Sequence, residues 1–353
     1  MKKVMMLIPA LNPPDDLIGY IDDLIVEGFD SILLVDDGSS EKFRWIFDEL
    51  ENRKETVVFR HAVNLGKGRA LKNGINHFLN LEDKDEYAGI ITVDSDGQHA
   101  VADVKNVRDA LLAQPDAFYL GSRNFNLSQV PPKSKFGNKM TSAVFHLLYG
   151  MKLGDTQTGL RAIPTALAPL FIDLAGERFE YEMNMLIECS MKKVSVKEIE
   201  IRTIYFDSNS ETHFNPITDS LAIYGLLFKN FFKYMMSSAT SFLIDILLFQ
   251  IILMAAKDMD AGQRILVATI GSRLGSSIVN YAMNHKLVFN SKVPGKQTIV
   301  KYYILVVVQM LASAGLVAAI YSMSGIPETV IKIVVDSLLF LLSYRIQKKL
   351  VFN

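Results

Sequence analysis

Short apolar runs alternate with amphipathic stretches through the first third of the chain. The apolar runs are Val4–Ile8, Ile32–Val35, Val57–Phe59, Ile90–Val93 and Ala117–Leu120. Between them, apolar residues recur at helical spacing over Asp15–Glu27, Glu41–Asn52, Gly68–Leu81 and Val101–Ala113. Short strands that alternate with helices are typical of a mostly parallel sheet covered by helices. The pattern therefore predicts an α/β domain.

From Tyr234 onward the pattern changes to four long apolar segments. They are Tyr234–Ala256, Ile265–Asn284, Tyr302–Met323 and Ile326–Tyr344. Each is close to the roughly 20 residues with which a helix crosses a bilayer. Buried core helices of a soluble domain are the alternative, but four such segments separated by short polar breaks favour a membrane domain. We expect an α/β domain over residues 1–216 and a domain of four transmembrane helices over residues 234–353.

The segment that joins the two domains, residues 217–233, is rich in leucine and aromatic residues and ends with Lys229 and Lys233. Such a composition is too apolar for a solvent-facing linker. It predicts an interfacial helix on the cytoplasmic membrane surface that leads into the first span.

Charge divides the 353-residue chain in the same place. Residues 1–228 carry 24 basic and 33 acidic residues, and residues 229–353 carry 13 basic and 5 acidic residues. Most basic residues of the second part lie before the first apolar segment, between the second and third, and after the fourth. By the positive-inside rule these sites, and the α/β domain with them, belong on the cytoplasmic side of the cell membrane. No basic block with interleaved aromatic residues indicates nucleic-acid binding.

Polar clusters follow the predicted strands, where ligands bind in parallel sheets. The most informative is Asp94-Ser95-Asp96-Gly97-Gln98-His99, after the fourth apolar run. Carboxylates at i and i+2 can share a hard divalent cation such as Mg²⁺ or Mn²⁺, which in turn binds diphosphate oxygens. A solvated turn is the alternative for the triplet alone. Neither a dinucleotide fingerprint nor a Walker A loop is present.

Five segments in order carry a family resemblance. They are Val35-Asp36-Asp37-Gly38-Ser39, Asn64-Leu65-Gly66-Lys67-Gly68, Asp94 to His99, Gly121-Ser122-Arg123 and Asp155-Thr156-Gln157-Thr158-Gly159-Leu160-Arg161. With these, residues 1–228 resemble family 2 glycosyltransferases of the GT-A fold, and among them the polyprenyl-phosphate sugar synthases of the dolichol-phosphate mannose synthase group. The membrane part, with Asn280 to Phe289 as its clearest segment, resembles the GtrA-like domain.

The resemblance implies a role for each matching residue. Metal ligands would be Asp94, Asp96 and Gln98, for Mg²⁺ or Mn²⁺. Contacts to a UDP- or GDP-hexose donor would come from Pro9, Leu11, Asn12, Asp36, Asp37, Lys67, Asp94 and Ser95. The phosphate of a polyprenyl phosphate acceptor would bind Arg123, Lys135 and Lys139. Asp96 and Arg123 would be the catalytic residues. The partners would include the lipid bilayer, and whether the chain forms a homo-oligomer is left open.

The charge of the acceptor phosphate determines which catalytic groups the transfer needs. A phosphomonoester is already an anionic nucleophile, so it needs no general base. It needs a basic clamp that aligns it with the anomeric carbon, and a single displacement then inverts that carbon. We interpret Glu180 and Glu182, on a helix predicted over Phe179–Met191, as structural.

Two other functions are weighed against this one. A processive polysaccharide synthase would carry a Gln-x-x-Arg-Trp motif, but the single tryptophan, Trp45, lies in an early helix. Glycolipid flipping by the membrane domain, with the α/β domain as its loader, stays open. The charged residues Asp245, Arg273 and Asp336 within the apolar segments support it, because ionisable groups at membrane depth are often functional.

The membrane part also contains an internal repeat. Lys286-Leu287-Val288-Phe289-Asn290 recurs at the C-terminus as Lys349 to Asn353. Two hairpins with the same ends cytoplasmic predict a pseudo-two-fold axis. The same offset relates Arg273 to Asp336, and we expect these two side chains to form an ion pair.

Overall fold

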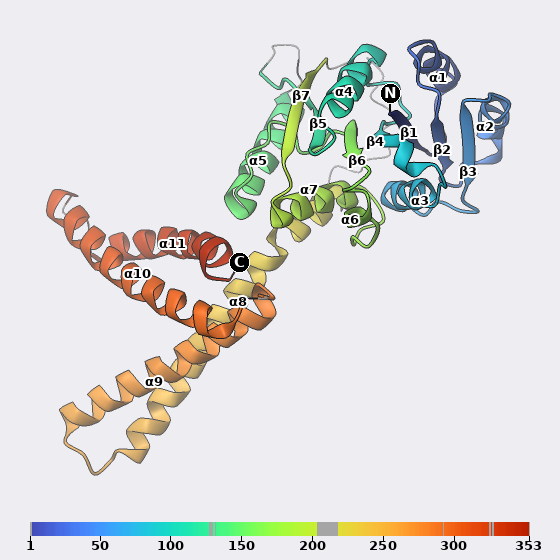
Figure 1. Cartoon of the computed structure of the whole chain (residues 1–353). Coiled ribbons are helices and arrows are strands. Elements are labelled where there is room, and N and C mark those ends of the chain that lie inside the picture. Colours follow the sequence, from blue (N-terminus) through green and yellow to red (C-terminus); the bar gives the residue numbers. More distant parts are fainter. Residues whose placement is uncertain are drawn as a thin grey trace. The chain divides into compact units, whose positions relative to one another are not determined.

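The computed structural model describes residues 2–126, 130, 132–202, 218–291, 293–324, 326 and 328–352 (Figure 1). The chain divides into two compact units, Met1–Leu226 and Leu227–Asn353.

Within the described residues, the first unit has one seven-stranded sheet in the order β3-β2-β1-β4-β6-β5-β7. Its strands are β1 (Lys3–Ala10), β2 (Ile32–Asp36), β3 (Thr56–Arg60), β4 (Tyr87–Thr92), β5 (Phe118–Arg123), β6 (Arg161–Pro164) and β7 (Val196–Ile201). Strand β6 is antiparallel to β4 and β5, and the other pairs are parallel. The predicted mostly parallel sheet is therefore confirmed, and β6 and β7 are additions to it.

Helices lie between the strands, close to where the apolar spacing predicts them. The α-helices are α1 (Leu17–Val26), α2 (Arg44–Glu51), α3 (Lys67–Leu79), α4 (Val101–Ala113), α5 (Pro132–Tyr149), α6 (Pro169–Ile172) and α7 (Glu180–Lys192). Short 3₁₀ turns, η1 (Glu41–Phe43) and η2 (Lys84–Glu86), precede α2 and β4.

Strand β1 shows how the sheet is covered on both faces. Its alternate residues Met6 and Ile8 belong to a buried cluster with residues of α1, α2 and α4. On the other face, Leu7 packs so closely on α3 that a Cβ at Gly74 would lie 2.2 Å from a Leu7 methyl carbon. Because successive strand residues point to opposite faces, a sheet covered on both sides has continuous apolar strands. Strand β1 therefore has no solvent-facing side.

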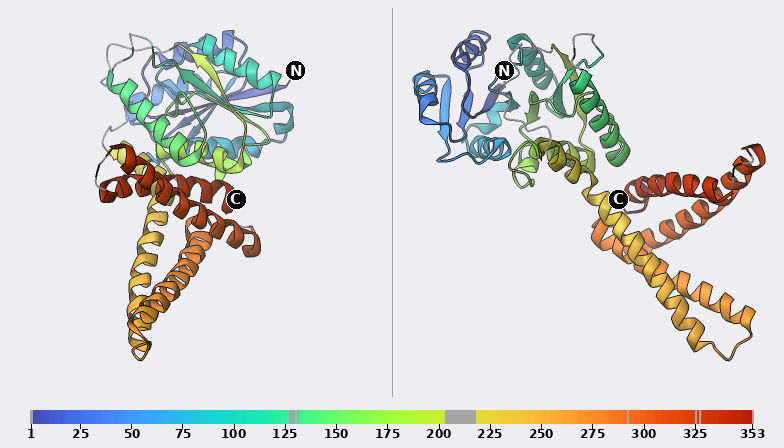
Figure 2. Two further views of the ribbon diagram at one scale, coloured as in Figure 1. Left: turned by 90° about the vertical axis from the view of Figure 1, so that its left-hand side faces the viewer. Right: turned by 180° about the vertical axis from the view of Figure 1, so that it is seen from behind.

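As far as the structure describes it, the second unit consists of four long helices. These are α8 (Thr218–Ala255), which starts in the first unit, α9 (Ala261–Met283), α10 (Gly295–Ser324) and α11 (Glu328–Ile346). A π-helical turn follows each hairpin: η4 (Asn284–Val288) after α9 and η5 (Gln347–Val351) after α11. Within this unit the hairpins α8–α9 and α10–α11 meet near η4 and η5 and diverge from there (Figure 2).

Two helices among the described residues are long and apolar enough to cross a membrane. They are Leu221–Ala255, with a mean hydropathy of 1.9, and Gly295–Ser324, with 2.2. Only 6% and 12% of the residues in their most apolar windows are buried, so neither has the surroundings of a soluble protein's core helix. Helices α9 and α11 form where the second and fourth spans are predicted, but four membrane crossings stay a prediction.

The predicted interfacial helix is the beginning of α8. The structure has one uninterrupted helix from Thr218 to Ala255, where the sequence suggested a surface helix followed by a separate span. Residues 203–217, which end the predicted α/β domain, lie outside the described residues. The position of this segment at a membrane surface stays a prediction.

The internal repeat has a structural counterpart. Equivalent residues of the two repeats meet: the Asn284 amide donates to the Gln347 amide oxygen at 3.1 Å, across 63 sequence positions. Contact between equivalent residues is what a pseudo-two-fold axis requires. The expected Arg273–Asp336 pair is wrong, because the repeat does not encode which way each helix face turns. Arg273 lies 3.6 Å from Asp245, and Asp336 accepts a hydrogen bond of 2.5 Å from Ser313.

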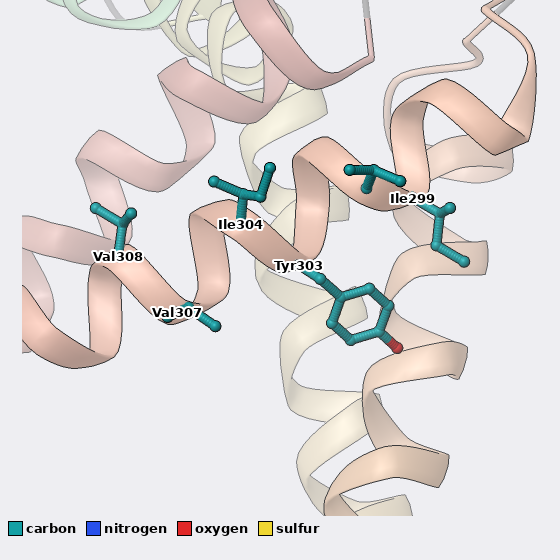
Figure 3. A pocket seen from close by; sticks show the side chains of 6 residues that line it. Ile299, Tyr303, Ile304, Val307 and Val308 are labelled. Carbon is teal, nitrogen blue, oxygen red and sulfur yellow. The ribbon is translucent and has the colours of Figure 1, made fainter.

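A shallow apolar groove of about 620 Å³ runs along α10 (Figure 3). It is lined by Ile299, Val300, Tyr303, Ile304, Val307 and Val308. The Tyr303 hydroxyl is already hydrogen-bonded to Ser277 at 2.9 Å. An almost wholly apolar groove offers nothing to a charged nucleotide, so the candidate chemistry lies in the first unit.

Candidate functional site

The carboxyl ends of β2, β1 and β4 lie side by side, because these strands are parallel neighbours in the sheet. The loop after β1 is tied to the loop after β2. The Asn12 backbone N–H donates to the Ser39 hydroxyl at 2.9 Å, and the Asn12 side-chain oxygen accepts from the Ser40 N–H at 2.8 Å. Asn12 adopts a left-handed backbone, with φ of 47°, which asparagine tolerates better than most residues. Pro9 and Leu11 belong to the same strand end.

Asp36 and Asp37, predicted to bind the donor, are engaged with the chain itself. The Asp36 carboxylate accepts from the Ser39 N–H at 2.8 Å. The Asp37 carboxylate is buried and accepts from the N–H groups of Leu65 and Gly66, at 2.9 and 2.8 Å. In this structure Asp37 therefore holds the loop that starts α3, and a contact to the donor stays a prediction.

A histidine, which sequence reasoning missed, completes the Asp37 network. The Asn73 amide donates to His61 Nε2 at 2.9 Å, so Nε2 is the acceptor nitrogen. Nδ1 therefore carries the proton that is donated to Asp37, at 2.7 Å. The loop before α3 is thus fixed from two sides.

Asp94 and Asp96 follow β4 and differ in exposure. Asp94 is partly buried, and Asp96 is exposed and accepts from the Gln98 N–H at 3.0 Å. Although the residue is exposed to solvent, partial desolvation of its carboxylate and the neighbouring Asp94 carboxylate raise the pKa of Asp96. Burial opposes ionisation of Asp94 as well, but the Lys67 ammonium and His99 hold the pKa of Asp94 below its ordinary value. Asp94 and Asp96 are like charges that repel each other at the sheet edge. A divalent cation bound between them would relieve this repulsion.

The metal ligands Asp94, Asp96 and Gln98 stay a prediction. No group of three His, Cys, Asp or Glu side chains within the described residues is arranged to hold a metal. Asp94, Asp96 and the neutral Gln98 fit instead as an incomplete set of hard oxygen donors, which diphosphate oxygens would complete. The exposure of Asp96 leaves room for such a ligand.

Two buried residues next to Asp94 were not given a role from the sequence. His99 is buried, with Nε2 3.6 Å from an Asp94 oxygen and no protein partner for Nδ1. Gly159, in the loop before β6, lies directly against the carboxylate: a Cβ there would lie 2.3 Å from an Asp94 oxygen. The Gly159 carbonyl accepts from Thr92 at 2.8 Å, which fixes this loop on β4. The motif from Asp155 to Arg161 was the signal for this loop.

Lys67 begins α3 and reaches Asp94. Its ammonium lies 2.7 Å from an Asp94 oxygen and 2.9 Å from a Glu182 oxygen on α7. Burial disfavours the charged ammonium, yet the two carboxylates raise the pKa of Lys67 above its ordinary value. Lys67 therefore contacts the predicted metal site at Asp94, and it links Glu182 to that site.

A polar hollow of about 480 Å³ lies beyond the ends of β5 and β7. Its lining includes Arg123, Asn126, Lys139, Ser142 and Glu200. The Arg123 guanidinium binds the fully buried Asp155 through two nitrogens, at 2.6 and 3.2 Å. Lys139 donates to Asn126 at 3.0 Å. Two of the three predicted acceptor-phosphate residues therefore share one hollow, and Lys135 is not among those that line it.

Helix α5, which contributes Lys139, has an exposed apolar stripe. Phe136, Met140 and Leu147 are 68%, 42% and 39% exposed, and they are spaced by four and seven residues, so they share one helix face. The helix contains no acidic residue. Thr141 of α5 lies 3.2 Å from the hydroxyl of Tyr224 at the start of α8. A candidate membrane span thus begins beside α5.

Comparison with protein families gives two matches. Residues 6–157 match the model described as glycosyl transferase family 2. Residues 225–352 match the model described as the GtrA/DPMS transmembrane domain. Together they include the Asp94 loop, Arg123 and the helices α9, α10 and α11.

Three archaeal relatives align with about two thirds of the chain. An uncharacterized protein of Methanocaldococcus jannaschii, MJ1222, is 30% identical over 65% of this chain and 93% of its own length. A UDP-N-acetylglucosamine–dolichyl-phosphate N-acetylglucosaminyltransferase of Methanococcus voltae is 29% identical over 64% of this chain and 95% of its own. The glycosyltransferase AglJ of Haloferax volcanii is 25% identical over 65% and 71%.

Proposed function

Since this chain belongs to glycosyl transferase family 2 and carries a GtrA/DPMS transmembrane domain, we propose that it transfers a hexose from a nucleotide-sugar to a polyprenyl phosphate at the membrane. One observation carries the proposal: the carboxylates of Asp94 and Asp96 and the polar hollow at Arg123 follow strands of one sheet, in a membrane protein. The name of the Methanococcus relative supports a lipid phosphate acceptor, and it makes UDP-N-acetylglucosamine the first donor to test.

The donor would bind at the ends of β1, β2 and β4. Asp94, Asp96 and Gln98 would hold Mg²⁺ or Mn²⁺, which would supply positive charge for the departing nucleoside diphosphate. Lys67 lies against Asp94 and would meet the same diphosphate. The loops at Asn12 and Asp36 would contact the nucleoside.

The acceptor phosphate would bind in the hollow at Arg123 and Lys139. Asp155 orients the guanidinium of Arg123, and a planar cation suits bidentate capture of a phosphate. A phosphate oxygen would form the new bond to the anomeric carbon while the bond from that carbon to the diphosphate breaks. The displacement inverts the anomeric carbon, and no proton has to be removed from the nucleophile.

The α/β domain would face the cytoplasm. Lys286 lies in the turn after α9 and Lys296 in the first turn of α10, and the C-terminal end contains Arg345, Lys348 and Lys349. The positive-inside rule places both regions on the cytoplasmic side in a multi-pass arrangement, together with the start of α8.

Glycolipid flipping has less support than it had from the sequence. The intramembrane charges that favoured it have partners within their own hairpins: Arg273 pairs with Asp245, which also accepts from Ser276 at 3.1 Å. Asp336 accepts from Ser313 of the neighbouring helix. These contacts give the charges a role in helix packing, which is the simpler interpretation.

The test uses the purified full chain in detergent, a panel of UDP- and GDP-sugars and a short polyprenyl phosphate. The expected result is one donor that yields a phosphate-linked lipid monosaccharide, detected by mass spectrometry, together with released nucleoside diphosphate. Transfer to a polyprenol or to a free sugar, but to no lipid phosphate, would overturn the acceptor assignment. Product formation that persists in excess EDTA would overturn the proposed metal dependence.

A further inference from the structure

Lys67 occupies the place where a bound cation would meet Asp94. Its ammonium is 2.7 Å from Asp94 Oδ1, and the lysine side chain is only 18% exposed. A contact this short between opposite charges is strong where water is largely excluded. A divalent cation that binds Asp94 must therefore share this carboxylate with Lys67, or displace the ammonium from it.

Glu182 gives the ammonium a second partner. Glu182 Oε2 lies 2.9 Å from Lys67 Nζ, and its side chain is 9% exposed. Its other oxygen, Oε1, is buried without a hydrogen bond, 3.8 Å from Nε of the buried Arg161. Arg161 itself donates to backbone carbonyls of Thr158 and Glu182, at 2.9 and 2.6 Å. Glu182 is thus held between two cations, one of which contacts the predicted metal site.

The contacts of Glu182 differ from those expected of a purely structural acid. An isolated carboxylate as enclosed as Glu182 is costly, and a purely structural acid would pair with Arg161 by a close hydrogen bond. Instead, its shorter contact is to the lysine that also touches Asp94. Glu182 is therefore placed to hold the Lys67 ammonium when Asp94 binds another cation.

We propose that Glu182 is a positioning residue that shares the Lys67 ammonium with Asp94, so that Lys67 and a divalent cation compete for Asp94. This inference rests on the proposed metal dependence and adds a residue pair to it. Without donor or metal, Lys67 neutralises Asp94. When a cation takes Asp94, Glu182 would keep the ammonium that it already contacts at 2.9 Å.

The charges predict the direction in which each of three variants changes the affinity for Mn²⁺. Lys67→Met removes a cation beside Asp94, so Mn²⁺ should bind the protein without nucleotide-sugar at least about tenfold more tightly. Glu182→Gln removes the alternative partner of the ammonium and one negative charge, so Mn²⁺ should bind at least about tenfold more weakly. The double variant has the wild-type net charge and should lie between the two.

The chain offers a matched control on the same helix. Lys72 of α3 is also buried, and its ammonium lies 2.8 Å from Glu177, but this pair does not touch Asp94. Lys72→Met and Glu177→Gln should leave Mn²⁺ affinity within about twofold of wild type. Either can lower thermal stability, as can the Lys67 and Glu182 variants, so stability alone does not separate the pairs.

Mn²⁺ affinity of the full chain in detergent is measured by electron paramagnetic resonance, without turnover, and folding is checked by thermal melting. Lys67→Gln serves as the second variant if Lys67→Met does not fold. Tighter binding for the lysine variant and weaker binding for Glu182→Gln support the inference. If wild type binds Mn²⁺ but these variants bind it equally, or if the lysine variant binds it more weakly, the inference is overturned and the proposed function stands. If wild type binds no Mn²⁺ and transfers sugar in EDTA, both the metal dependence and the inference fall.

Discussion

Phe289 and Phe352, which are 63 positions apart, stack with their ring centroids 5.2 Å apart and their planes inclined by 18°. They occupy equivalent positions in the two copies of the repeat in the membrane domain. In each copy the phenylalanine N–H donates to the carbonyl five positions earlier: Phe289 to Asn284 at 3.0 Å, and Phe352 to Gln347 at 2.9 Å. The same local structure thus occurs twice, and the copies contact each other through equivalent residues.

Gln347 should be important for the stability of this junction. Its amide accepts from Asn284 and donates to the Tyr234 hydroxyl and to Ser343, and it is 4% exposed. Gln347→Leu removes these hydrogen bonds, although Asn284 still donates to Asn280 and Ser343 to Gln309. The cost is about 1–3 kcal/mol for a buried group that stays unsatisfied. We expect a lower melting temperature in detergent. Ser337→Ala, at an exposed position on α11, is the control. Equal melting of the two variants would contradict a stabilising network.

Asp96→Asn should reduce sugar transfer by about 100-fold or more, because it removes a charge from the proposed metal site with little change in volume. Folding should be unaffected, since Asp96 is exposed and its carboxylate accepts from the Gln98 N–H of its own turn. Initial rates with saturating donor and acceptor test this, with the exposed Asp85→Asn as control. Full activity of the purified Asp96 variant would remove Asp96 from the site.

Gly159→Ala tests whether the position of Asp94 matters. The new Cβ would lie 2.3–2.5 Å from three Asp94 carboxyl atoms, so either the carboxylate or the loop must move. A displacement of about 1 Å at a reacting site can cost on the order of 100-fold. We expect transfer to fall while the fold is kept. Gly19→Ala on α1, with nothing within 4 Å of its Cβ, should behave as wild type. If both alanine variants are fully active, the Asp94 carboxylate has more freedom than the structure indicates.

The sequence was sufficient for the first five strands because each is an apolar run bounded by polar turns. It was not sufficient for β6 and β7. Strand β6 has four residues and begins with the buried Arg161, and β7 is an edge strand with as many charged as apolar residues. The carboxylate motif after β4 was readable, since its chemistry is local. The contact between Lys67 and Glu182 was not, because it joins residues 115 positions apart through the packing of α3 and α7.

Arg123→Ala should affect both stability and acceptor use. Asp155, its partner, is fully buried, so removing the guanidinium leaves a buried carboxylate unpaired, at about 1–3 kcal/mol or more. Arg123→Ala/Asp155→Asn removes this penalty and isolates the effect on substrate. In that double variant we expect the acceptor KM to rise at least about tenfold with little change in donor affinity. A collapse of donor binding with an unchanged acceptor KM would place Arg123 in the donor site.

The exposed stripe of α5 should matter only when the acceptor lies in a bilayer. Phe136, Met140 and Leu147 share a helix face without acidic neighbours on that helix, and Tyr224 ties α5 to the start of a candidate span. An apolar face flanked by lysines binds the lipid headgroup region, with a strength that grows with the apolar area buried. Replacing Phe136 and Met140 by serine should therefore lower transfer to a long polyprenyl phosphate in proteoliposomes by about tenfold or more.

The same double variant should transfer sugar normally to a short, detergent-dispersed polyprenyl phosphate, because its hollow at Arg123 is intact. Val26→Ser, at a site on α1 that is 86% exposed and distant in sequence, is the control in both assays. Equal loss of activity in detergent and in proteoliposomes would mean that the stripe supports the fold of α5 and not its contact with lipid. Wild-type activity in both would leave α5 away from the membrane surface.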